Sequence, residues 1–232
     1  RYGNTWGLRN STFNINQGEL AVLVGPNGAG KTTTVRILTT FLRPTQGKAE
    51  VLGMDVVKDY KKIRNRIAYL PQGYEVNNNL TPLESVKWTL VARGTSLSEA
   101  KLRAKKWMEL MSLEHCMNRT CWTLSGGEKR KVAVGMTLAT DADVVFLDEP
   151  TTGLDVEARH IIWKIVRDIV TEGTTILLTT HDMKEGEIIA DTAVLMNHGQ
   201  TVNQNTPQSL IKTLPYQYRV TMRKEGLNGA TH

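Results

Sequence analysis

An apolar run that ends in a glycine-rich loop constrains the fold of this chain more than any other feature. Residues 19–24 are apolar after Glu19, which is typical of a buried parallel strand. Residues 25–32 then read Gly-Pro-Asn-Gly-Ala-Gly-Lys-Thr. Apolar residues recur after this loop at helical spacing, which predicts a helix over residues 32–42 that carries Val35, Leu38 and Leu42. The order of strand, glycine-rich turn and helix predicts an α/β fold with an anion-binding loop at a helix N-terminus.

The residue types in this loop suit a phosphate group. Glycines at 25, 28 and 30 allow tight bends, so that several N–H groups point at one spot. Lys31 adds positive charge for the outer phosphates, and the Thr32 hydroxyl suits Mg²⁺. We therefore predict that the phosphates of a nucleotide bind to Gly25, Pro26, Asn27, Gly28, Ala29, Gly30, Lys31, Thr32 and Thr33.

A second apolar run ends in two carboxylates. Residues 144–147 are apolar, and Asp148 and Glu149 follow them directly. Ligands of parallel sheets bind at the carboxyl ends of the strands, so both acids are expected beside the loop. Asp148 is then placed to hold Mg²⁺, usually through water. Glu149 is placed to orient and deprotonate an attacking water molecule.

The segment Ser125-Gly126-Gly127-Glu128 predicts a second helix start. Its Ser-x-x-Glu pattern is a capping box, and Val132, Met136 and Ala139 continue it at helical spacing. The two glycines leave the backbone open to close approach, so this helix N-terminus also suits an anion. The capping role and the anion-binding role are compatible with each other.

The remaining patterns predict a mostly parallel sheet that an all-helical segment interrupts. Strands are expected at residues 67–70 and 174–180, with a shorter one at 48–52 and a hairpin over 192–202 that turns at His198-Gly199. Residues 77–139 contain no convincing strand. They begin with the capping box Thr81-Pro82-Leu83-Glu84, and a second amphipathic helix is expected over 94–111.

Composition sets further limits. Among the 232 residues, no apolar run approaches the roughly 18–20 residues of a membrane span. Cys116 and Cys121 are too few for a disulfide framework and His115 beside Cys116 does not complete a four-ligand zinc site, so we expect reduced thiols. The net charge of +6 is compatible with nucleic acid, an anionic membrane or a solvated surface. Its even spread along the chain favours the solvated surface.

These motifs, in this order and spacing, resemble those of the nucleotide-binding subunits of ABC (ATP-binding cassette) proteins. Residues 25–32 resemble the Walker A motif, and Asp148 and Glu149 resemble Walker B with its catalytic glutamate. Residues 124–128 resemble the signature, with Glu128 where glutamine is common. Four further matches complete the resemblance: Gln72 (Q-loop), Thr152-Gly153-Leu154-Asp155 (D-loop, with threonine for serine), His181 (switch histidine) and Tyr2 (the aromatic ring on adenine).

The resemblance implies how the site works. Two such domains close head to tail around two ATP molecules, each held between one chain's Walker A loop and the other chain's Ser125, Gly126, Gly127 and Glu128, with Asp155 among the ATP-binding residues. Thr32, Gln72 and Asp148 surround Mg²⁺. The residues implied in catalysis are Lys31, Gln72, Glu149, which polarises the water, and His181, which contacts the γ-phosphate.

The resemblance also suggests a biological setting. The single short cassette and the segment Asn79-Leu80-Thr81-Pro82-Leu83-Glu84-Ser85 most resemble ATPase subunits of ABC-2 exporters. The implied protein is peripheral on the cytoplasmic face of the cell membrane and works with a second ATPase domain and an integral membrane permease. A soluble ABC ATPase acting on nucleic acid or ribosomes is the alternative, and the basic pI of about 9.3 is its support.

The expected organisation is a single ABC ATPase domain over residues 1–232. Its P-loop NTPase core comprises residues 1–76 and 140–214. An inserted helical subdomain occupies about 77–139, and a C-terminal tail occupies 215–232. No nucleic-acid partner is expected for the exporter subunit.

Overall fold

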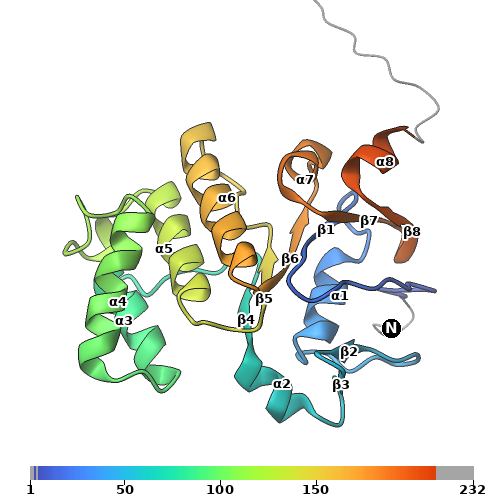
Figure 1. The fold of residues 1–232 in the computed structure, drawn as a ribbon, viewed down its shortest axis with the longest axis horizontal. Coiled ribbons are helices and arrows are strands. Elements are labelled where there is room, and N and C mark those ends of the chain that lie inside the picture. The colour runs from blue at the N-terminus through green and yellow to red at the C-terminus, as the bar shows by residue number, and fades with distance from the viewer. Residues whose placement is uncertain (1–2, 4, 213–232) are drawn as a thin grey trace, which may run out of the picture.

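The central sheet combines five parallel strands with one antiparallel strand in the part of the chain that the structure describes (Figure 1). The structure is a computed structural model that describes residue 3 and residues 5–212. The strand order is β4-β5-β6-β1-β7-β8. The strands are β1 (Leu20–Val24), β4 (Ile67–Leu70), β5 (Val144–Asp148), β6 (Thr175–Thr180), β7 (Thr192–Asn197) and β8 (Gln200–Asn205).

Helices cover both faces of this sheet (Figure 1). Alternate residues of β1 divide between the two cores: Leu20 and Val22 pack with the α6 and α7 side, whereas Ala21 and Leu23 pack with the α1 and α2 side. The strands are therefore apolar on both faces, as parallel strands between helices are. These helices are α1 (Lys31–Leu38), α2 (Tyr60–Arg66), α6 (Val156–Thr171), α7 (Met183–Ile189) and α8 (Pro207–Lys212).

The segment between β4 and β5 contains helices and no strand, as predicted for residues 77–139. Its elements are α3 (Pro82–Ala92), α4 (Leu97–Leu110), the short 3₁₀ helix η1 (Cys121–Thr123) and α5 (Gly126–Leu138). Both predicted capping boxes are present, at Thr81/Glu84 and Ser125/Glu128. The helix predicted over 94–111 begins later, because Gly94 adopts a positive φ of 94° and Ser96 caps the helix instead.

Two other predicted boundaries were wrong. The helix after the loop ends at Leu38 and not at residue 42, because Thr40 adopts φ 64° while the N–H groups of Phe41 and Leu42 turn back to the Arg36 carbonyl. The strand predicted at 48–52 is only β2 (Glu50–Val51), which pairs with β3 (Met54–Asp55) in a separate two-stranded sheet. The hairpin that turns at His198-Gly199 is confirmed as β7 and β8.

Candidate functional site: a phosphate-binding loop at the sheet edge

Three neighbouring strands place the predicted site residues at one edge of the sheet. In the pairing register, Val24 at the end of β1 lies beside Thr180, and Asp148 at the end of β5 lies beside Thr179. Gly25, Glu149 and His181 follow these strand ends directly. The loop, the two carboxylates and the histidine therefore meet where parallel sheets bind ligands.

The loop glycines are required for different physical reasons. A Cβ at Gly25 would lie 2.2 Å from the Met196 carbonyl oxygen on β7, so this glycine permits close packing of two main-chain segments. A Cβ at Gly28 would meet open space, but its φ of +80° favours glycine. Gly30 has φ +103° and also packs against Gly7 and Leu8. It is the residue before α1, so the loop leads straight into a helix N-terminus.

Lys31 lies inside the loop. Its ammonium group donates hydrogen bonds to the carbonyls of Gly25 (2.6 Å) and Pro26 (3.2 Å). Burial lowers the pKa of Lys31, and the nearby carboxylates of Glu149 and Asp148 act in the opposite direction. The sequence prediction that Lys31 brings positive charge to the loop agrees with this position.

Asp148 has the chemistry of a cation ligand. The side chain is fully buried, and its Oδ1 accepts hydrogen bonds from Thr179 (2.5 Å) and Thr32 (3.3 Å). Its Oδ2 is buried and has no hydrogen-bond partner among the described residues. An unpaired buried carboxylate oxygen is costly, and a hard divalent cation such as Mg²⁺ prefers oxygen ligands. The carboxylate of Asp148 and the hydroxyl of Thr32 thus fit Mg²⁺.

Glu149 is held in an uncommon conformation and surrounded by polar groups. Its φ of 51° lies in the left-handed region, which costs a non-glycine residue about 1–2 kcal/mol and is often found at functional sites. Its carboxylate accepts hydrogen bonds from Gln72 (3.3 Å) and from Thr152 of the D-loop (3.2 Å). His181 Nδ1 lies 3.7 Å from Glu149 Oε1. The structure therefore brings Gln72, Glu149 and His181 together, as predicted.

Arg130 and Thr179 hold the two carboxylates in position, and the sequence motifs predicted neither residue. Arg130 on α5 donates to the carbonyls of Asp148 (3.1 Å), Glu149 (2.6 Å) and Pro150 (2.9 Å). Thr179 accepts from the Glu149 N–H (3.0 Å) while it donates to Asp148. The sequence does not distinguish Thr179 from the other threonines of β6, Thr175 and Thr180, and it does not distinguish Arg130 from the lysines on either side of it.

The signature segment forms its own set of hydrogen bonds at the start of α5. The Glu128 carboxylate accepts from the Ser125 N–H (2.7 Å) and contacts His115 (2.9 Å), and no hydrogen bond found in residues 5–212 joins residues 125–128 to the loop. The Ser125 N–H is the largest of the causes that lower the pKa of Glu128 to about 2. Asp155 caps α6 by accepting from the Ala158 N–H (2.8 Å).

Tyr2 and Thr33 are the two remaining predicted residues. Tyr2 lies outside the described residues. Thr33 borders a separate groove of about 1270 Å³ between the segment around Phe13 and the β2–β3 hairpin. That groove contains none of the other predicted loop residues.

Comparison with known proteins decides the family. A family profile described as "ABC transporter" matches residues 8–152, more than half of the chain. The chain belongs to the ABC transporter family. This confirms the resemblance seen in the motifs, and an ABC cassette belongs to the ATPases with a P-loop fold.

Relatives of this ABC cassette include ATP-binding proteins of exporters. The daunorubicin/doxorubicin resistance ATP-binding protein DrrA of Streptomyces peucetius is 36% identical over 92% of this chain and 64% of its own length. A Nod factor export ATP-binding protein I of Burkholderia orbicola is 34% identical over 92% of this chain and 70% of its own length. The chain thus spans about two thirds of these relatives. They give no support to the nucleic-acid alternative.

Solved ABC structures share the fold. An ATP-binding cassette in a dimeric post-hydrolysis state bound to ADP and Pi superimposes with a TM-score of 0.80 at 25% identity, covering 88% of this chain and 91% of that one. CbiO1 of Clostridium perfringens, part of an ABC transporter complex, gives 0.78 at 26% identity, covering 89% and 84%. Both agree with the predicted α/β fold class. Within residues 5–212, no helix combines the length and apolar character needed to cross a bilayer.

Proposed function

We propose that this chain binds MgATP in the loop of residues 25–33 and hydrolyses it to drive export through a membrane partner. The observation that carries the proposal is the convergence of Lys31, Asp148 and Glu149 near the carboxyl ends of β1 and β5, the two strands that flank β6. The similarity to ATP-binding proteins of drug and Nod factor exporters supports the export role. Such a subunit would lie on the cytoplasmic face of the membrane beside an integral membrane permease.

Each residue of the cluster has a proposed part. Lys31 and the loop amides neutralise phosphate charge, and Thr32, Asp148 and Gln72 hold Mg²⁺, which when bound supplies further positive charge at the phosphates. Glu149 accepts a proton from the attacking water, and His181 contacts the γ-phosphate. The hydrogen bonds from Gln72 and Thr152 to the Glu149 carboxylate support the role of Glu149 as the base, since they orient its oxygens. Tyr2 remains the proposed platform for the adenine ring.

Within residues 5–212 no hydrogen bond joins the signature to the loop of the same chain, which supports a site shared between two chains. We propose that Ser125, Gly126, Gly127, Glu128 and Asp155 act on the nucleotide of a second cassette. The start of α5 suits an anion, because the exposed Gly126 allows close approach. The cassette comprises residues 1–232, with a core of 1–76 and 140–214, a helical subdomain of about 77–139 and a tail of 215–232.

The Glu149→Gln variant tests the proposed catalysis. The change preserves the shape of the side chain and removes the base, so ATP binding should persist while turnover falls about 10²–10⁴-fold. Binding is measured by calorimetry with Mg²⁺, and turnover by phosphate release from the purified chain. Glu157→Gln is the matched control, because Glu157 is exposed on the first turn of α6. Near-normal turnover of the Glu149 variant would remove this residue from the catalytic role.

A mixing experiment tests the shared site. Lys31→Ala disables the loop, and Gly126→Asp places a negative charge at the start of α5, where an added side chain meets open space and should not disturb folding. Each variant alone should be inactive. A mixed dimer contains one site with an intact loop and an intact signature, so ATPase activity should return in proportion to the amount of mixed dimer. That amount is measured by giving the two variants different affinity tags and purifying on both. Mixed dimers without activity would contradict the shared site.

A further inference from the structure

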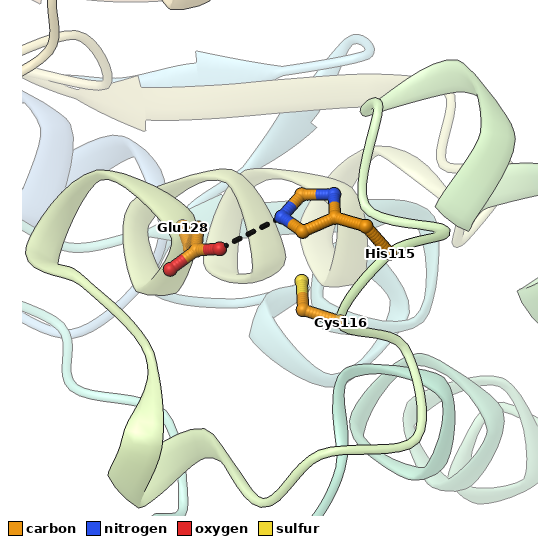
Figure 2. A group of neighbouring side chains, drawn as sticks. All are labelled: His115, Cys116 and Glu128. Atoms are coloured by element: carbon orange, nitrogen blue, oxygen red, sulfur yellow. Dashed lines mark hydrogen bonds and ion pairs between the residues drawn. The ribbon is translucent and has the colours of Figure 1, made fainter.

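Three side chains with different donor atoms lie together where the loop after α4 meets the start of α5 (Figure 2). They are His115, Cys116 and Glu128, and their ligand atoms all lie within 4.8 Å of one another. His115 Nε2 already points at Glu128 Oε1, at 2.9 Å. His115 and Cys116 are neighbours in the sequence, and the fold brings Glu128 to them.

The local structure holds each donor in place. Cys116 is fully buried in a turn, where its N–H donates to the Leu113 carbonyl (3.1 Å) and its thiol contacts the same oxygen (3.4 Å). Glu128 is fixed by the capping box, in which its Oε2 accepts from the Ser125 N–H. Oε1 is thus the oxygen that faces His115. A ligand at Oε1 would leave the cap of α5 intact.

We propose that His115 Nε2, Cys116 Sγ and Glu128 Oε1 form a binding site for a divalent ion of the Zn²⁺ class. Zn²⁺ binds nitrogen, sulfur and oxygen at about 2.0–2.3 Å in tetrahedral geometry. Tetrahedral ligands at these lengths lie about 3.3–3.8 Å apart, so the observed spacing needs only small side-chain adjustments. The mixture of thiolate and imidazole selects against Mg²⁺ and Ca²⁺, which prefer oxygen ligands.

The surroundings allow such an ion to enter and to be balanced. The His115 side chain is 61% exposed, so the ion can arrive from solvent and keep a water molecule as its fourth ligand. A thiolate and the Glu128 carboxylate together balance a charge of +2. The nearby cationic side chains form hydrogen bonds with main-chain carbonyls. Lys131 donates to the Ser112 carbonyl (3.2 Å), and Arg119 donates to the Thr123 carbonyl (3.1 Å). Binding would tie residues 115–116 to the signature segment.

Cobalt substitution tests the site directly, without nucleotide. The purified full chain is titrated with Co²⁺ alone and followed by absorption, because a cobalt–thiolate bond gives a charge-transfer band in the near ultraviolet. We expect such a band to saturate at one Co²⁺ per chain and to disappear when Zn²⁺ is added in equal amount. Excess Mg²⁺ should leave it unchanged. Absence of the band would overturn the proposal.

Variants identify the ligands. Cys116→Ser should abolish the band, whereas Cys121→Ser should keep it, since both residues are buried free cysteines and only Cys116 belongs to the cluster. His115→Ala and Glu128→Gln should each weaken Co²⁺ binding at least about tenfold, as even the loss of an outer-shell partner costs a site about 10–100-fold. Both should fold, because His115 is exposed and glutamine also serves in a capping box. A band that depends on Cys121, or unchanged affinity in both variants, would refute the site.

Discussion

Arg130 should be a positioning residue whose loss affects both stability and turnover. Its guanidinium donates three hydrogen bonds to the consecutive carbonyls of Asp148, Glu149 and Pro150. Arg130→Met keeps much of the apolar stem and removes all three bonds. Hydrogen bonds to charged groups contribute about 1.5–3 kcal/mol each, but the removed charge no longer has to be desolvated. We therefore expect the free energy of unfolding to fall by about 2–4 kcal/mol.

The same change should loosen the turn that carries Glu149. This turn has a left-handed backbone at Glu149, which the surrounding contacts must hold in place. If the looser turn raises the activation free energy of hydrolysis by about 1.4 kcal/mol, the rate falls tenfold. We therefore expect ATP turnover to fall at least about tenfold. Arg130→Lys should recover only part of the loss, because an ammonium group cannot reproduce the fork of a guanidinium.

Urea unfolding followed by circular dichroism measures the stability, and phosphate release measures the turnover. Lys131→Met is the matched control on the same helix. The Lys131 side chain donates an exposed hydrogen bond to the Ser112 carbonyl, so the unfolding free energy of this variant should stay within about 0.5 kcal/mol of that of the parent chain. Arg130 has no positioning role if Arg130→Met matches Lys131→Met in both stability and turnover.

Two other predictions concern the cap of α5 and the loop. The pKa of Glu128 is lowered from 4.5 to about 2 in the folded chain, so its carboxylate stabilises the fold fully above pH 4.5, and this contribution is lost as the pH falls toward 2. Urea unfolding at several pH values should show a stability difference from Glu128→Gln that shrinks over this window, and a constant difference would contradict the argument. Gly25→Ala should destabilise the chain by about 1–3 kcal/mol or more, since its Cβ would lie 2.2 Å from the Met196 carbonyl oxygen. Gly126→Ala, whose Cβ meets open space, should cost less than about 1 kcal/mol in the same assay, and equal effects would refute the packing role of Gly25.

The sequence predicted features that depend on neighbours in the chain. The apolar run of β1 and the Ser125/Glu128 capping box are patterns of a few consecutive residues, and the structure reproduces both. Where a local pattern failed, another local interaction prevailed. The apolar spacing continues to Leu42, yet the left-handed Thr40 ends α1 at Leu38. Spacing predicts which face a helix would bury, but it does not decide which residue leaves the helix.

The sequence by itself determined which residue types the site uses: a glycine-rich loop, a lysine and two carboxylates at strand ends. Only the tertiary structure decided which residues support them. Arg130 reaches the carbonyl of Glu149 from a separate helix, and His115 reaches Glu128 from the loop after α4. The physical reason is that such contacts depend on how α5 packs against its neighbours. A pattern of adjacent residues carries the geometry of one element, whereas distances between elements arise only when the chain folds.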